Sequence, residues 1–165
     1  MTALHFMSIA EKAMTQIEKG AFLTVKAGYD INTMTIGWAT MGICWKKPVF
    51  MVAVRDSRHT FTLMERAEDF TVSIPLGDMK KEIAFCGTRS GRDTDKFAAC
   101  GLKTAPAQFV QSPIVDASCI HIECRIVHKS PMNPEFLIAD YLSLYPERDF
   151  HTLYFGEIQA CYERR

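Results

Sequence analysis

The chain has no excess charge of either sign and no apolar run long enough to cross a membrane. Its 19 basic residues balance 19 acidic ones, so neither nucleic acid nor an anionic membrane is expected as the main partner. No apolar run approaches about 18 residues, and the first residues lack a basic region followed by a long apolar stretch, which disfavours both membrane spanning and secretion. We therefore expect a cytoplasmic protein.

The chain also lacks the signatures of several chemical sites. It has no Gly-x-Ser-x-Gly elbow, P-loop or Gly-x-Gly-x-x-Gly fingerprint. None of its six cysteines forms a Cys-x-x-Cys pair, and we interpret them as small buried hydrophobic residues with free thiols. A redox role for Cys86 is the alternative. His121 and Glu123 lack a third metal ligand, so we expect a solvated or dimer-facing polar stripe and no metal site.

Strand-like runs dominate what the chain does contain. A length of 165 residues makes one domain, 1–165, the default, and no internal repeat or long linker divides it. The patterns predict strands at 21–26, 34–44, 48–55, 70–74, 119–128, 136–145 and 153–162. They predict helices from a capping box at Ser8 to near Gly20, after Ser57, at 79–86 and at 95–100.

The alternation of apolar and polar residues is clearest at 119–128. Its isoleucines and Cys124 share one face, while His121, Glu123 and Arg125 share the other, as in a half-buried strand. Because strands outnumber helices and no regular βαβ alternation occurs, we expect a mainly β fold in which an antiparallel sheet closes into a barrel.

The segment 49–60 has the pattern of a phosphate site. Six apolar residues fit a buried strand, and Ser57 precedes a run with apolar residues at helical spacing, which predicts an N-capped helix. Free backbone N–H groups and the positive end of the helix dipole would then converge beside Arg55 and Arg58, where an anion can bind. The alternative is an ordinary strand-to-helix turn with solvated arginines.

Four blocks of sequence, in order between residues 30 and 101, carry a family resemblance. They are NTMTIGWATMGICWKKP at 32–48, RDSRHT at 55–60, FTVSIP at 70–75 and CGTRSGRDTDKF at 86–97. Together they resemble the flavin reductase-like family, in its flavoredoxin branch of the FMN-binding split barrels. The resemblance implies a six-stranded antiparallel Greek-key barrel with short flanking helices. It also implies non-covalent FMN and a homodimer with the flavin near the subunit interface.

The resemblance implies roles for three groups of residues. The phosphate would be held by Arg55, Ser57, Arg58 and Thr60, with His59 either reaching the same oxygens or facing solvent. The isoalloxazine ring would lie against Thr33, Met34 and Thr35, with Trp38 either at the ring or in the core. A second flavin-contacting segment would comprise Ser90, Gly91, Lys96 and Phe97, in which Lys96 or Arg92 places a cation near the N1–C2=O edge of the ring.

The resemblance implies an NAD(P)H-dependent flavin oxidoreductase, in which hydride passes from the nicotinamide to flavin N5. Because the chain has no Rossmann fingerprint, the nicotinamide would lie directly over the flavin. We assign no side chain as catalytic acid or base, since the chemistry belongs to the cofactor. The alternatives are a flavoredoxin-type electron carrier reduced by a protein partner, and a barrel without flavin that binds another phosphorylated ligand.

Overall fold

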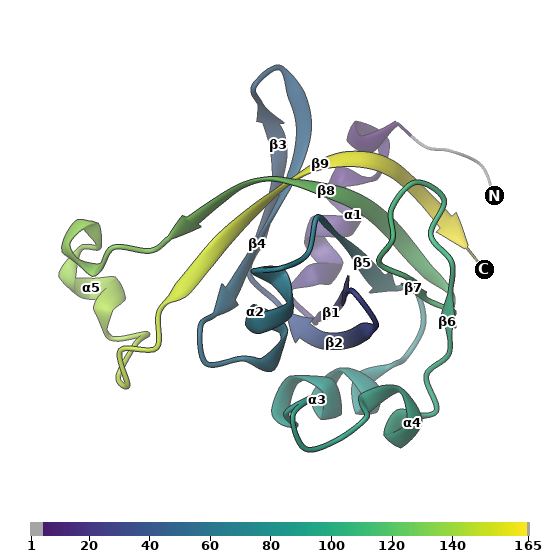
Figure 1. The fold of residues 1–165 in the computed structure, drawn as a ribbon. Helices are drawn as coiled ribbons and strands as arrows, with labels where there is room; N and C mark the ends of the chain where they lie inside the picture. Colours follow the sequence, from purple (N-terminus) through teal and green to yellow (C-terminus); the bar gives the residue numbers. More distant parts are fainter. Residues whose placement is uncertain (1–4, 165) are drawn as a thin grey trace.

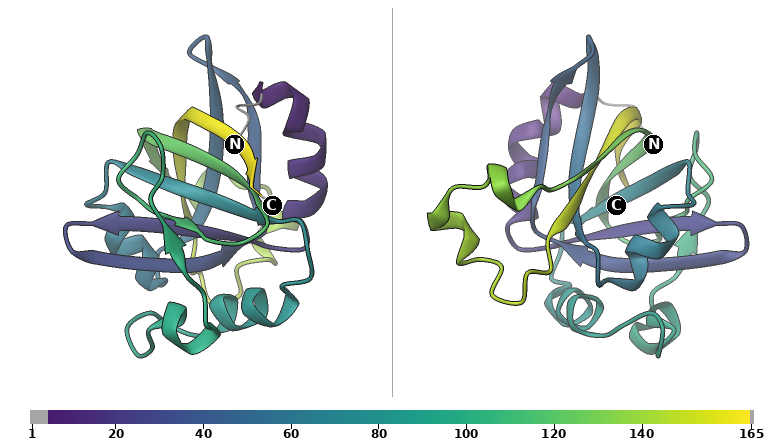
Figure 2. Two further views of the ribbon diagram at one scale, coloured as in Figure 1. Left: turned by 90° about the vertical axis from the view of Figure 1, so that its right-hand side faces the viewer. Right: turned by 60° about the vertical axis from the view of Figure 1, so that its left-hand side comes forward.

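The computed structural model describes residues 5–164, and its main feature is one antiparallel sheet that coils into a barrel (Figures 1 and 2). Seven strands follow one another across the sheet in the order β2-β1-β5-β8-β9-β4-β3. They are β1 (Ala21–Ala27), β2 (Asp30–Ile36), β3 (Ala39–Cys44), β4 (Lys47–Arg55), β5 (Asp69–Pro75), β8 (Cys119–Pro131) and β9 (His151–Arg164). A separate short ribbon pairs β6 (Thr104–Ala105) with β7 (Ile114–Val115). The predicted mainly β barrel is confirmed.

Short helices flank the barrel. They are α1 (Phe6–Ile17), α2 (His59–Met64), α3 (Lys80–Thr88), α4 (Lys96–Cys100) and α5 (Ala139–Leu142), with a 3-10 turn η1 (Pro134–Phe136). In Figure 1, α3 and α4 lie beside one another beneath β1 and β2. α1 buries Ile9, Ala13 and Ile17 and begins earlier than predicted, because the His5 imidazole caps it and Ser8 donates to the His5 carbonyl. No helix within residues 5–164 has the length and apolar character needed to span a bilayer.

The strand predicted at 34–44 is two strands. β2 ends at Ile36, Gly37 and Trp38 break the pairing, and β3 then turns onto β4. The β3–β4 hairpin projects from the barrel in Figure 1, and its tip uses the left-handed region at Trp45 (φ 51°) and Lys46 (φ 59°). The neighbouring Cys44 is exposed, so the interpretation of every cysteine as buried is wrong at this position.

The strand predicted at 136–145 is absent. The chain instead leaves the sheet after β8 and forms an excursion, residues 132–150, that contains η1 and α5 and stands away from the barrel (Figure 1). The Asn133 side chain accepts a hydrogen bond from the Glu135 N–H at 2.9 Å, and Pro134 fixes the backbone of the turn. These local interactions favour a turn here, although the apolar residues of the segment suggested a strand.

The polar face of β8 is buried at His121 and Glu123, where a solvated or dimer-facing stripe was expected, whereas Arg125 on the same face is exposed. His121 and Glu123 have no exposed surface, because the 104–115 segment lies over them. The Glu123 carboxylate accepts hydrogen bonds from the N–H groups of Gln108 (2.8 Å) and Phe109 (2.7 Å) and from the Tyr162 hydroxyl (2.7 Å). A carboxylate that accepts three hydrogen bonds can be buried without the full cost of desolvation.

Candidate functional site

Two adjoining pockets lie where β2 meets the start of α2 and the 88–96 segment. The smaller, of about 130 Å³, is lined by Met34, Ser57, Arg58, His59, Thr60, Thr88, Arg89, Ser90, Gly91, Arg92 and Lys96. The larger, of about 280 Å³, is lined by Met34, Thr35, Ile36, Gly37, Trp38, Ala53, Arg55, Arg58 and His151. We call the first the anion pocket and the second the β2–β4 pocket. Because Met34 and Arg58 line both, the two form one continuous site.

Four cationic side chains line the anion pocket: Arg58, Arg89, Arg92 and Lys96. Three of them are held by backbone carbonyls: Arg58 Nη2 donates to Gly87, Arg92 Nη1 donates to Ser57 at 3.0 Å, and Lys96 Nζ donates to Cys86 at 2.9 Å. Within residues 5–164, no ion pair joins any of these three to a carboxylate. Confined positive charge without a counter-ion favours an anionic ligand.

Burial and neighbouring charges shift two pKa values in the anion pocket. The pKa of Lys96 is lowered to about 8, mainly by burial and in part by the charge of Arg58, against the opposing effect of Cys86. Only 3% of Lys96 is exposed, so the ammonium has little water to compensate it. The pKa of His59 is also lowered, first by burial and then by the charges of Arg92 and Lys96. A bound anion would attract the protonated forms of Lys96 and His59 and so raise both pKa values.

Directed hydrogen-bond donors accompany the cations. Asn32 Nδ2 donates to the Thr60 hydroxyl at 2.8 Å, which leaves Thr60 able to donate its own proton. The backbone N–H groups of His59 and Thr60 belong to the first turn of α2, so they have no acceptor within the helix. At Gly91, a Cβ atom would lie 2.3 Å from Asn32 Oδ1 and 2.7 Å from His59 Cδ2. Glycine therefore allows the loop to close against β2 and α2.

Arg55 lies outside the anion pocket, and Ser57 lines that pocket but donates its hydroxyl proton to Asp149. Asp149 accepts hydrogen bonds from the backbone N–H (3.1 Å) and hydroxyl (2.6 Å) of Ser57, so α2 is capped at Arg58 rather than at Ser57. The guanidinium of Arg55 donates to the Asp149 carbonyl at 3.0 Å and lies over the Tyr145 ring. Arg55 therefore lines the β2–β4 pocket instead of the anion pocket. The carboxylate that binds the Ser57 hydroxyl, that of Asp149, belongs to the excursion.

Two aromatic side chains, Trp38 and His151, line the β2–β4 pocket. Their ring centroids lie 4.7 Å apart with the planes tilted by 40°, and the Tyr145 hydroxyl is 2.8 Å from His151 Nδ1. Burial, and then the charge of Arg55, lower the pKa of His151 to about 4, so its imidazole is neutral at pH 7. His151 was not predicted as a site residue. The pairing of Arg55 with His151 across β4 and β9 brings it to the pocket, and no local motif marks it.

The other predicted residues divide into two groups. Met34, Thr35, Trp38, Ser90, Gly91 and Lys96 line the site as expected, and His59 faces the anion pocket. Thr33 and Phe97 line neither pocket. The hydroxyl of Thr33 is buried and donates to the Leu23 carbonyl at 3.2 Å, so only its backbone could reach a ligand. Within residues 5–164 no cluster of three potential metal ligands occurs.

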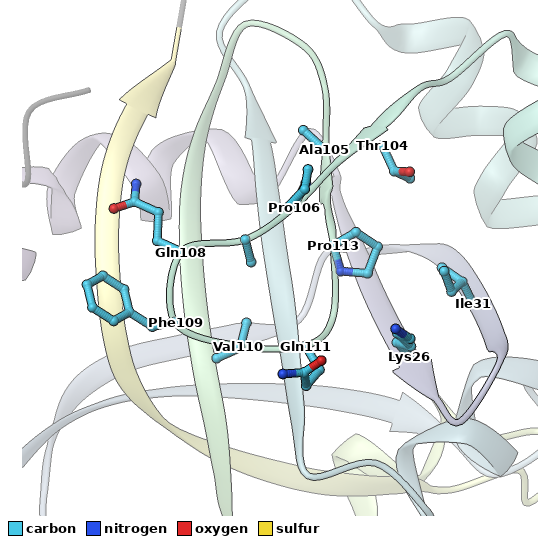
Figure 3. Close-up of a pocket in the computed structure, with 11 residues that line it drawn as sticks. Lys26, Ile31, Thr104, Ala105, Pro106, Gln108, Phe109, Val110, Gln111 and Pro113 are labelled. Atoms are coloured by element: carbon cyan, nitrogen blue, oxygen red, sulfur yellow. The ribbon is translucent and has the colours of Figure 1, made fainter.

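Two further pockets lie outside this pair. A pocket of about 630 Å³, lined mostly by apolar residues of α1, β4, β9 and the excursion, adjoins the β2–β4 pocket through Gly37, Trp38 and Ala53. A pocket of about 530 Å³ is framed by the 104–113 segment, with Lys26 and Ile31 from the β1–β2 hairpin (Figure 3). It contains none of the predicted site residues, and Lys26 is the one cation among its lining residues.

Comparisons with known proteins identify relatives of the chain and of its fold. The family model described as "Flavin reductase like domain" matches residues 19–165. The flavoredoxin of Desulfovibrio vulgaris (Miyazaki F) superposes with a TM-score of 0.70 at 24% identity, over 88% of this chain and 69% of that one. An FMN-binding protein of Thermus thermophilus gives 0.64 at 21%, over 87% and 69%. The NADH:FAD oxidoreductase of Streptomyces globisporus C-1027 gives 0.68 at 16%, over 88% and 75%.

The lowered pKa of Lys96 predicts pH-dependent anion binding. Sulfate keeps its charge across the range, whereas Lys96 loses its own as pH rises through about 8. Between about pH 7 and about pH 9.5, the sulfate affinity measured by calorimetry should fall by roughly 10- to 30-fold, because the loss of one proton at a pKa of about 8 limits the change over this range. In Lys96→Gln, the affinity should be weak at both pH values. A wild-type affinity that does not change with pH would exclude Lys96 from the anion site.

Proposed function

We propose that this chain, which belongs to the flavin reductase-like domain family, binds FMN and is an NAD(P)H-dependent flavin oxidoreductase. One observation carries the proposal: a small pocket, in which Arg58, Arg92 and Lys96 have no ion-pair partner within residues 5–164, adjoins a larger pocket lined by aromatic and apolar side chains. A phosphate at one end and a planar ring at the other match these two surroundings. The names of the similar structures support the same cofactor and donor classes.

The residues divide between the two ends of such a ligand. In the anion pocket, Arg58, Arg92 and Lys96 would pair with the phosphate, and Thr60 and the N–H groups of the first turn of α2 would donate hydrogen bonds to it. Gly91 would allow close approach of the loop backbone. When bound, FMN would supply the redox chemistry, namely acceptance of hydride from a nicotinamide and transfer of electrons to an acceptor.

In the β2–β4 pocket the side chains would orient the ring, and the His151 imidazole beside it would stay neutral at pH 7. Met34 and Trp38 offer apolar surface, and Thr35 is held by its hydrogen bond to the Ile83 carbonyl at 2.5 Å. The neutral His151 is fixed by Tyr145, and Arg55 is fixed by Asp149. The contribution of these side chains is position and electrostatics, so we assign none of them as a general acid or base.

An electron carrier is the second candidate, because Trp38 at the wall of the β2–β4 pocket is 45% exposed and a partner protein could approach there. The flavoredoxin of Desulfovibrio vulgaris supports this candidate through its name and fold. In it, the same pockets would hold FMN, and reducing equivalents would come from a redox protein rather than from NAD(P)H. Both candidates depend on the same cofactor site and differ in the electron donor.

Replacement of Arg58 should weaken FMN binding. Arg58→Ala removes a cation shared by both pockets, and we expect a loss of about 1.5–3 kcal/mol, as for a hydrogen bond to a charged group. Fluorescence titration of the apoprotein measures it. Arg66→Ala is the matched control, because Arg66 pairs with Asp30 on the surface and lines neither pocket. Equal affinities for Arg58→Ala and wild type would remove Arg58 from the phosphate site.

Anaerobic reduction tests the choice of donor. On addition of NADH or NADPH to the yellow holoprotein, we expect rapid bleaching of the flavin absorbance. Persistence of the colour with both nicotinamides, together with bleaching by a reduced ferredoxin, would support the electron carrier instead. A colourless preparation that takes up no added FMN would contradict both and favour another phosphorylated ligand.

We also propose a homodimer. Exposed apolar side chains occur on the β3–β4 hairpin, at Ile43 and Trp45, and on the excursion, at Phe136 and Ile138, which is the kind of surface that a second subunit covers. Light scattering at micromolar concentration should give twice the mass of one chain. A monomeric mass under these conditions would contradict the proposal.

A further inference from the structure

Two cysteines lie on either side of the loop that forms one wall of the anion pocket. Cys86 belongs to the last turn of α3, and Cys100 is the last residue of α4. The segment between them carries more than half of the residues that line the pocket: Thr88, Arg89, Ser90, Gly91, Arg92 and Lys96. A covalent bond between the two sulfurs would therefore close this wall into a ring.

The two thiols meet in a small apolar cluster. Cys86 is completely buried there with Phe22 and Val115, and Cys100 packs against the cluster from α4 while remaining partly exposed. Cys100 lies close enough to Cys86 to raise the pKa of the Cys86 thiol, second only to the effect of burial. The cluster is separate from the main barrel core, and α3 and α4 lie side by side in both figures of the fold (Figures 1 and 2). A bond between the two sulfurs would therefore join two short neighbouring helices and involve no strand of the sheet.

We propose that Cys86 and Cys100 form a reversible disulfide that closes the wall of the anion pocket, with a peroxide as the oxidant. The partly exposed Cys100 sulfur attacks hydrogen peroxide and becomes a sulfenic acid, releasing one water. The Cys86 sulfur then attacks the oxidised sulfur, which forms the S–S bond and releases a second water. Two thiols and one peroxide give one disulfide and two waters, and a dithiol reductant reverses the change.

The surroundings assign the two steps to different cysteines. Burial, followed by the nearby Cys100, raises the pKa of Cys86 to about 12, so Cys86 is a poor first nucleophile. It is well placed as the second, because Cys86 and Cys100 are the two cysteines of this cluster. The remaining buried cysteines, Cys119, Cys124 and Cys161, lie within the sheet, and Cys44 is on the distant β3–β4 hairpin.

Lys96 couples this pair to the pocket. Its ammonium donates to the Cys86 carbonyl at 2.9 Å, and its charge favours the thiolate form of Cys86. The same ammonium lines the anion pocket, so a bound anion would offset the charge that favours the thiolate. An occupied anion pocket should therefore slow disulfide formation.

Peroxide treatment of the full-length apoprotein tests the bond. We expect the intact mass to fall by two hydrogen atoms, a non-reducing peptide map to join Cys86 to Cys100, and dithiothreitol to restore the starting mass. Cys44→Ser should behave like wild type, and Cys100→Ser should lose the link. Retention of both thiols, a link between other cysteines, or conversion of Cys100 only to sulfinic acid would overturn the proposal.

A second measurement tests the coupling without relying on FMN. With sulfate at a concentration that saturates the anion pocket, the rate of disulfide formation should fall several-fold relative to chloride at equal ionic strength. Equal rates in the two salts would overturn the coupling through Lys96. Because the probe is sulfate, failure of this inference is distinguishable from failure of the proposed flavin chemistry.

Discussion

The proximity of Arg58, Arg92 and Lys96 without a counter-ion is the constraint on which the site depends. Backbone carbonyls hold the three cations in place, but a carbonyl dipole compensates a full charge only in part. Burial, together with the charge of Arg58, lowers the pKa of Lys96 to about 8. A dianion would supply the missing charge, and its binding would relieve the repulsion among the cations.

The fold assembles this charge from two separate parts of the chain. Arg58 lies at the start of α2, and Arg92 and Lys96 belong to the loop after α3 and the first turn of α4, across the edge formed by β2. The excursion 132–150 contributes indirectly, because its Asp149 accepts a hydrogen bond from the Ser57 hydroxyl beside the anion pocket and holds Arg55 at the β2–β4 pocket. Asp149 thereby keeps Arg55 apart from the cations of the anion pocket.

The sequence predicted the features that local interactions decide. The α4 helix lies where Asp95 and Gly101 indicated, since the Asp95 side chain caps it and Gly101 adopts φ 64°. The barrel class was also predictable, from strand alternation and from the family resemblance. The burial of Glu123 depends on a distant loop, and the loss of Ser57 as helix cap depends on Asp149, 92 positions away. Contacts of that range leave no periodic signal in the sequence.

The most direct test of the central claim compares FMN with riboflavin, which has the same ring and lacks the phosphate. If the three cations bind a phosphate, FMN should bind the apoprotein at least about 100-fold more tightly than riboflavin, as expected when two or more charge-assisted hydrogen bonds are lost. Equal dissociation constants for the two ligands, measured by fluorescence titration at the same pH and ionic strength, would contradict the account.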